Sequence, residues 1–280
     1  MARQLSGRKK LTVGRFLQYI YIYLLVIIVL LPVCNIFISA FKTNIEIQRS
    51  NVFPEAFRLE NFINVLKTDI FYSGMFNSIV ITGGSLLLSL FLAALAAYPL
   101  SKNNGKVYTF IYLFFLSANM IPQVTNMVPL YGIMSDLNLI DTRVGMILLY
   151  ASRLSMGILL FTSFYKTIPR DMTDAAEIDG CNYFQAFTKV VFPMIKPVSI
   201  TYIMVNIINI WNDFLLPQLF LPSRAKQTIT LAVYTFSNER GSDWGAIFAL
   251  MTLSVVVPTI IFVTNQKYFF EGMTVGAVKG

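Results

Sequence analysis

Six long apolar stretches alternate with shorter polar segments along this chain of 280 residues. A helix needs about 20 largely apolar residues to cross roughly 30 Å of hydrocarbon, and each stretch meets that length. We therefore predict an all-α membrane protein, a single transmembrane domain over residues 1–280. Its six expected spans are residues 16–40, 71–100, 107–131, 144–165, 198–221 and 244–266.

The composition agrees with this prediction and removes several classes of protein. Only 13% of the residues are charged, about half the share in a soluble domain. The chain has no histidine, and its two cysteines lie far apart at Cys34 and Cys181. We therefore expect no metal site, no disulfide and no catalytic residues. The net charge of +8 indicates basic flanks of membrane helices rather than a nucleic-acid partner.

The distribution of basic residues predicts the orientation in the lipid bilayer. Arg3, Arg8, Lys9, Lys10 and Arg15 precede the first span, and an excess of Lys and Arg marks the cytoplasmic side. That span is too long for a cleavable signal peptide. Both termini are then cytoplasmic, with an inner loop at residues 167–197 and an inner tail at residues 267–280.

The inner loop carries signals for two short helices. Pro169 suits the start of the first helix, and Gly180 suits the left-handed residue that ends it. Asn182 and Gln185 then have the spacing of a capping box. The second helix is expected from Tyr183 to about residue 192, where Pro193 stops it.

The composition of this loop favours a protein partner. Ala175 and Ala176 offer a small, flat surface beside Glu177 and Asp179. Exposed aromatic side chains favour contact with a partner or with the lipid interface, and we expect three of them, at Tyr183, Phe184 and Phe187. A surface hairpin without a partner is the alternative.

Three segments together resemble the permease subunits of carbohydrate ABC importers, of the MalG type. Residues 174–180 read DAAEIDG and, with Pro193, are similar to the EAA loop of that family, with Asp174 where Glu is usual. Residues 272–280 resemble the family's C-terminal tail, and residues 211–217 read WNDFLLP, which is common among sugar importers. The resemblance implies the type I ABC importer permease fold in a bacterial or archaeal cytoplasmic membrane.

The resemblance also implies partners. The EAA helices couple the spans to a cytosolic ABC ATPase dimer, and here would use Asp174, Ala175, Ala176, Glu177, Asp179, Gly180, Phe184 and Phe187. The tail, through Gly276, Lys279 and Gly280, would reach the same ATPase. The loop at residues 237–243 would meet an extracellular or periplasmic sugar-binding protein through Asn238, Glu239 and Arg240. A second, homologous permease would complete a heterodimer.

The chain lacks the phosphate loop that holds ATP. The nearest candidate, Gly105-Lys106, has Leu100 in place of the first glycine and Val107 in place of Ser or Thr. We therefore expect a transport subunit that is not an enzyme and binds no cofactor, with ATP and Mg²⁺ held by the ATPase.

Polar residues inside the expected spans suggest a path for the substrate. A charge in hydrocarbon is costly and usually faces a cavity or a partner. The candidates are Arg153, Asn206, Asn209, Asn212 and Asp213. Trp211 and Phe214 would be the nearby aromatics for a sugar. The alternative for the asparagines and Asp213 is hydrogen bonding to other helices. Arg153 would suit an anionic sugar such as a uronide, unless it pairs with Asp213.

The leading prediction is therefore a permease subunit for carbohydrate, by family likeness an oligosaccharide. The alternatives are an ABC permease for another solute and a stand-alone secondary transporter or channel. The latter would need coupling carboxylates in several spans, and only Asp213 is available. An intramembrane enzyme fits least, because paired carboxylates and histidine are missing.

Overall fold

The computed structural model describes residues 13–241 and 243–277, and every regular element within those ranges is a helix. Its contacts divide the chain into two compact units. The first unit takes residues 1–67 and 240–253. Its helices are α1 (Val13–Ser39), α2 (Asn44–Gln48), α3 (Glu60–Leu66) and α15 (Trp244–Ser254).

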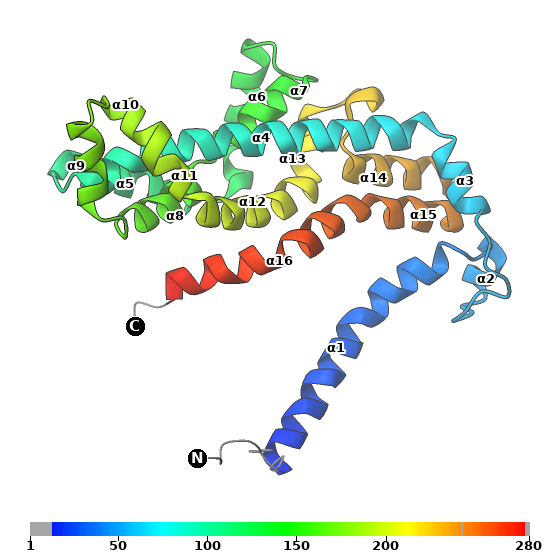
Figure 1. Ribbon diagram of the computed structural model, residues 1–280. Helices are drawn as coiled ribbons and strands as arrows, with labels where there is room; N and C mark the ends of the chain where they lie inside the picture. The colour runs from blue at the N-terminus through cyan, green and yellow to red at the C-terminus, as the bar shows by residue number, and fades with distance from the viewer. Residues whose placement is uncertain (1–12, 242, 278–280) are drawn as a thin grey trace, which may run out of the picture. The chain divides into compact units, whose positions relative to one another are not determined.

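The second unit takes residues 68–239 and 254–280. Most of it is α-helical, with short 3-10 or π segments (Figure 1). Its elements are α4 (Asp69–Lys102), α5 (Lys106–Ala118), η1 (Gln123–Asn126), α6 (Met127–Asp136), α7 (Arg143–Ala151), α8 (Ser155–Tyr165), α9 (Arg170–Ile178), α10 (Tyr183–Ala186), η2 (Phe187–Val191), α11 (Phe192–Met194), α12 (Lys196–Trp211), α13 (Leu215–Phe220), η3 (Arg224–Lys226), α14 (Ile229–Arg240) and α16 (Val256–Ala277).

Between three and six segments of the described chain are long and apolar enough to cross a membrane. Three are single helices, at Leu17–Ser39, Asp69–Lys102 and Trp244–Lys267. Three more are helix pairs that qualify only together. They bend by 96° between α5 and η1–α6, by 45° between α7 and α8, and by 72° between the helix ending at Met194 and α12.

Prolines lie at the starts of several helices. Pro129, Pro217 and Pro258 each lie in the first turn of a helix, in α6, α13 and α16. The missing N–H of proline costs little there, because the first turn has no internal partner for it. Pro122 directly precedes η1. These residues thus mark where one helix ends and the next begins.

The core of the second unit is built around α4, with α8, α7 and α12 packed on it (Figure 1). Small residues allow the close approach of α4 and α8, since Ala93, Ala94 and Ala97 are fully buried. A Cβ added at Gly157 of α8 would lie only 2.5 Å from the Cβ of Ala93. The Tyr165 hydroxyl donates to the Ala94 carbonyl over 3.1 Å.

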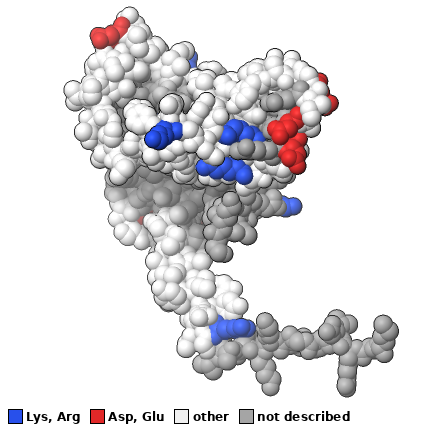
Figure 2. Space-filling model, turned by 90° about the vertical axis from the view of Figure 1, so that its left-hand side faces the viewer, with Lys and Arg blue, Asp and Glu red and all other residues white. Residues whose placement is uncertain are grey.

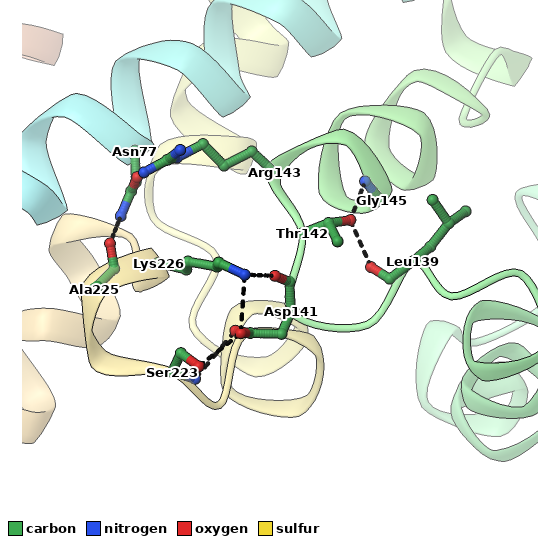
Figure 3. Close-up of polar contacts among 9 residues, drawn as sticks. All are labelled: Asn77, Leu139, Asp141, Thr142, Arg143, Gly145, Ser223, Ala225 and Lys226. Carbon is green, nitrogen blue, oxygen red and sulfur yellow. Dashed lines mark hydrogen bonds and ion pairs between the residues drawn. The ribbon is translucent and has the colours of Figure 1, made fainter.

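A polar cluster fastens the loop before α7 to the segment after α13 (Figure 3). The Asp141 carboxylate accepts hydrogen bonds from the Ser223 hydroxyl over 2.6 Å and the Ser223 amide over 3.1 Å. The Lys226 ammonium lies 3.1 Å from the same carboxylate. Burial would raise the pKa of Asp141, but Ser223 and Lys226 outweigh it and hold that pKa below its usual value.

A second contact in this region joins Arg143 to α4 (Figure 3). The Arg143 Nε donates to the Asn77 Oδ1 over 2.6 Å. The Asn77 amide nitrogen in turn donates to the carbonyls of Ala225 and Gln227, both over 2.9 Å. Asn77 is fully buried, so these bonds satisfy a polar group that would otherwise destabilise the fold.

In the first unit, the connection after α1 is organised by side-chain caps. Thr43 and Glu46 form a capping box at the start of α2. The Asn61 amide nitrogen donates to the carbonyls of Ala40 and Lys42, over 2.8 and 2.9 Å. The Lys42 ammonium is buried and donates to the carbonyl of Asn51 over 2.7 Å. This segment therefore has its own local hydrogen-bond network.

The structure places two helix ends. Residues 267–277, the first part of the expected inner tail, continue α16, so its glycines do not break the helix. The second loop helix runs to Met194, close to the end expected near Pro193. The π segment η2 precedes it, where the Phe192 amide donates to the Phe187 carbonyl five residues earlier.

Candidate functional site

The second unit contains a cavity of about 750 Å³, and three helix breaks meet at it. One break separates α5 from η1, one separates α7 from α8, and one separates α12 from α13. Interrupted membrane helices commonly form binding sites in transporters, because their irregular backbone is tolerated where it lines a cavity. The lining residues are Ser89, Asn119, Gln123, Val124, Tyr150, Arg153, Met156, Tyr202, Val205, Asn206, Ile208, Asn209, Ile210, Asn212, Asp213 and Leu215.

All five residues proposed from the sequence for the substrate path line this one cavity. Arg153 lies in the α7–α8 break and Asp213 in the α12–α13 break. Asn206, Asn209 and Asn212 follow the cavity wall along α12. Asn206 donates to the Tyr202 carbonyl in its own helix over 2.9 Å, so its amide oxygen is the group turned to other partners. A transport role for these residues remains a prediction.

The two charged residues are held differently. The Asp213 Oδ1 accepts the backbone amides of Leu215 and Leu216, over 3.0 and 3.3 Å, so this carboxylate caps the start of α13. The Arg153 guanidinium lies over the ring of Tyr150, 5.2 Å from its centroid. The ion pairs among the described residues join Arg224 to Glu239 and Lys226 to Asp141. Arg153 and Asp213 are therefore not an ion pair.

Sequence reasoning missed several polar residues of the cavity. Asn119 and Gln123 flank the first break, and Ser89, Tyr150 and Tyr202 also line the cavity. Asn119 and Gln123 lie on either side of Pro122, inside an apolar run. Two amides beside a proline in a predicted span are a signal that could have indicated them.

The aromatic residues first considered for sugar contact were assigned wrongly. Trp211 is buried, with 3% of its surface exposed, and Phe214 packs edge-on against Tyr234 at 4.8 Å between ring centroids. Neither lines the cavity, whose aromatic residues are Tyr150 and Tyr202. The Trp211 indole instead donates to the Ser254 carbonyl over 3.1 Å.

The inner loop folds as the predicted helix-turn-helix. Gly180 has a φ of +84° directly after α9, the left-handed conformation that favours glycine. The Cys181 amide donates to the Ala176 carbonyl over 2.9 Å, which satisfies a carbonyl at the helix end. The capping box of Asn182 and Gln185 is present at the start of α10. The local geometry of this elbow is therefore confirmed.

The exposed surface of this elbow differs from the prediction at two positions. Phe187 is fully buried against Tyr98, with ring centroids 5.5 Å apart, and Ala176 is buried as well. Phe187 therefore packs on α4 rather than facing a partner, and Ala176 lies on α9, which packs on α10 and η2. Tyr183 and Phe184 are about half exposed, as expected.

Further residues make up the outward face of the elbow. Asp174, Ala175 and Asp179 are exposed, and Glu177 belongs to α9. Ile178, which the sequence analysis did not single out, is 87% exposed. Figure 2 looks onto the end where α9 and α10 lie in Figure 1, and shows basic side chains beside acidic ones there. The elbow thus offers exposed apolar residues within a charged surround, as a docking surface requires.

The remaining predicted contact residues have these positions. Gly276 lies in the last turn of α16, and Lys279 and Gly280 lie outside the described residues. Asn238, Glu239 and Arg240 form the end of α14, so the expected loop at residues 237–243 is helical over its first part. Glu239 pairs with Arg224. The turn after α14 begins at Gly241, whose φ is +53°.

These features define a class of protein: a helical membrane protein with a polar cavity at helix breaks and a projecting helix-turn-helix. Residues 85–275 match the family described as binding-protein-dependent transport system inner membrane component. The chain belongs to that family of transport permeases.

Individual relatives agree. The probable ABC transporter permease protein YurM of Bacillus subtilis (strain 168) is 30% identical over 98% of this chain and 91% of the relative. The melibiose/raffinose/stachyose import permease protein MelC of the same organism is 31% identical over 82% and 84%. A chain of a bacterial ABC transporter involved in the import of the acidic polysaccharide alginate superposes with a TM-score of 0.81 at 22% identity, covering 96% and 100%. This last likeness shows the fold.

Proposed function

We propose that this chain is a permease subunit of an ATP-driven, binding-protein-dependent importer of carbohydrate, and that its substrates are oligosaccharides. The observation that carries the proposal is the cavity at the three helix breaks, which is lined by amide side chains from the first break and from α12. Amide groups both donate and accept hydrogen bonds, as the hydroxyls of a sugar require. Family membership and a relative named for melibiose, raffinose and stachyose support it.

The proposed topology has six spans with both termini in the cytoplasm of a bacterial or archaeal cell. Two bent pairs, α5–α6 and α7–α8, then count as one crossing each, and α12 together with α13 forms another. Basic residues in the N-terminal segment support this orientation. The elbow of α9 and α10 then lies on the cytoplasmic side.

The proposed partners follow from this topology. The elbow, with Gly180 at its turn and Ile178 and Phe184 exposed, docks into a cytosolic ATPase dimer that binds ATP and Mg²⁺. The last residues of α16 and the tail approach the same dimer. A second, homologous permease completes the path as a heterodimer. An extracellular or periplasmic sugar-binding protein meets the opposite side, near the end of α14.

The proposal is tested by affinity purification of the chain from its native membrane. We expect a second permease and an ABC ATPase to co-purify, and the complex to hydrolyse ATP faster when a sugar-loaded binding protein is added. The isolated chain should neither bind nor hydrolyse ATP, because it lacks a phosphate loop. ATP turnover by the isolated chain, or transport without an ATPase partner, would contradict the proposal.

A further inference from the structure

We infer that the cavity takes a carbohydrate that bears a carboxylate, a uronide, and that Arg153 binds that carboxylate. This inference rests on the proposed function and names the substrate class of the same site. Four observations carry it: the placement of Arg153, the lack of an ion pair between Arg153 and a described carboxylate, the capping role of Asp213, and the amides that line the same cavity.

Arg153 presents a guanidinium to the cavity without a protein anion to neutralise it. The residue is exposed, lines the cavity and makes no ion pair with a described carboxylate. A charge in a membrane domain is costly unless it meets a partner or a function. Because Arg153 forms no ion pair with a described carboxylate, we expect its anionic partner to come from outside the chain.

The surroundings of Arg153 orient it for an anion. The Tyr150 ring supports one face of the guanidinium at 5.2 Å, which leaves the planar edge with its N–H groups free to bind a carboxylate through two hydrogen bonds. The next helix, α8, starts at Ser155 without a side-chain cap. Its N-terminal amides add positive potential beside the guanidinium.

Asp213 does not cancel this preference. Its Oδ1 already accepts two amides at the start of α13, and it forms no ion pair with Arg153. The remaining carboxylate oxygen is an acceptor and suits a sugar hydroxyl. A solute that carries both a carboxylate and hydroxyl groups would therefore match Arg153 and Asp213 together.

The cavity that holds the two charged residues is also lined with amides. Asn119 and Gln123 come from the first break, and Asn209 and Asn212 come from α12. These groups bind the hydroxyls of neutral and acidic sugars alike, so they do not select between the two. Arg153 is the residue that selects acidic over neutral sugars, because its charge attracts a carboxylate.

The test measures the binding of sugars to the purified transporter complex in nanodiscs. Saturation-transfer difference NMR, which detects weak ligands, is the method. The probes are trigalacturonate and the matched neutral sugar galactotriose. We expect trigalacturonate to bind more tightly to the wild-type complex. Arg153→Gln should weaken the binding of trigalacturonate about tenfold and leave the binding of galactotriose unchanged. Arg153→Lys, which keeps the charge, should recover part of the loss.

Arg49→Gln is the matched control, because Arg49 is exposed and lies outside the cavity. This variant should bind both sugars as the wild type does. The inference is overturned if Arg153→Gln and wild type bind trigalacturonate equally, or if the wild type binds only galactotriose; the proposed function survives both results. Binding of neither sugar would overturn the inference and also remove this cavity from the proposed transport path.

Discussion

The indole Nε1 of Trp211 donates a hydrogen bond of 3.1 Å to the backbone carbonyl of Ser254. In a regular helix that carbonyl would accept the amide of residue 258, but residue 258 is proline and has no N–H. Trp211 therefore satisfies the carbonyl that Pro258 leaves free and ties α12 to the kink before α16. An unpaired carbonyl would be costly inside a membrane.

Trp211→Phe should lower the stability of the purified protein by about 0.5–1.5 kcal/mol, because it removes the hydrogen bond to the part-buried Ser254 carbonyl. The loss should shrink in a Pro258→Ala background, where the new backbone amide takes over that carbonyl. Thermal unfolding of the four proteins in detergent measures this. Trp244→Phe, at a partly exposed indole, serves as the control. Equal losses of stability in the wild-type and Pro258→Ala backgrounds would show that the hydrogen bond to Ser254 does not stabilise the protein.

Gly157→Ala should destabilise the packing of α4 on α8. The new Cβ would lie 2.5 Å from the Ala93 Cβ and 3.1 Å from the Tyr202 ring, so the helices must separate, at a cost of about 1–3 kcal/mol. The control is Gly83→Ala in α4, where the added Cβ meets nothing within 4 Å and helix propensity improves. A lower unfolding temperature for the first variant alone is expected. Equal unfolding temperatures for the two variants would contradict the close contact.

The cluster around Asp141 should loosen in acid. Its pKa is lower in the folded protein than in the unfolded chain, whose value is about 3.9. The contribution to stability is therefore complete above that unfolded value and is lost as the pH falls through the folded pKa. Limited proteolysis of the loop at residues 137–142 should accelerate below about pH 4.

Asp141→Asn should remove that pH dependence, because the side chain no longer titrates. Asp136→Asn is the control, because it changes an exposed carboxylate at the end of α6. This variant should keep the pH dependence of the cleavage. A wild-type loop that is cleaved at the same rate at pH 3 and pH 7 would contradict the role given to Asp141.

The local turn signals of the sequence predicted the elbow well, whereas burial could not be predicted in the same way. A glycine after α9 and an Asn–Gln box act over a few residues, so Gly180 and Asn182 were readable from sequence alone. Whether Phe187 faces a partner depends on Tyr98, far away in the chain. Similarly, nothing near Trp211 in the sequence reveals that its indole reaches Ser254.

The sequence predicted several residues that line the cavity, but it did not predict the helix breaks that form it. Charge and amides in apolar segments indicated Arg153 and Asp213, because hydrocarbon excludes such groups. The helix breaks at these residues have no glycine or proline within them, so the pattern predicted continuous spans. Asn119 was missed although its break contains Pro122.

The central claim, that this permease is coupled to an ATPase through the elbow, is tested most directly at Gly180. A side chain there is strained by about 1–2 kcal/mol at positive φ, yet its Cβ would contact nothing in the chain. Gly105→Trp is the matched control, since Gly105 is also exposed and lies in the other short inner loop.

The measurement is the sugar-stimulated ATP hydrolysis of the assembled complex, together with membrane expression and ATPase co-purification. Gly180→Trp should insert normally, bind the ATPase weakly and lose the stimulated hydrolysis, whereas Gly105→Trp should keep all three properties. Normal stimulation in Gly180→Trp, or a defect caused only by failed membrane insertion, would contradict the coupling role of the elbow.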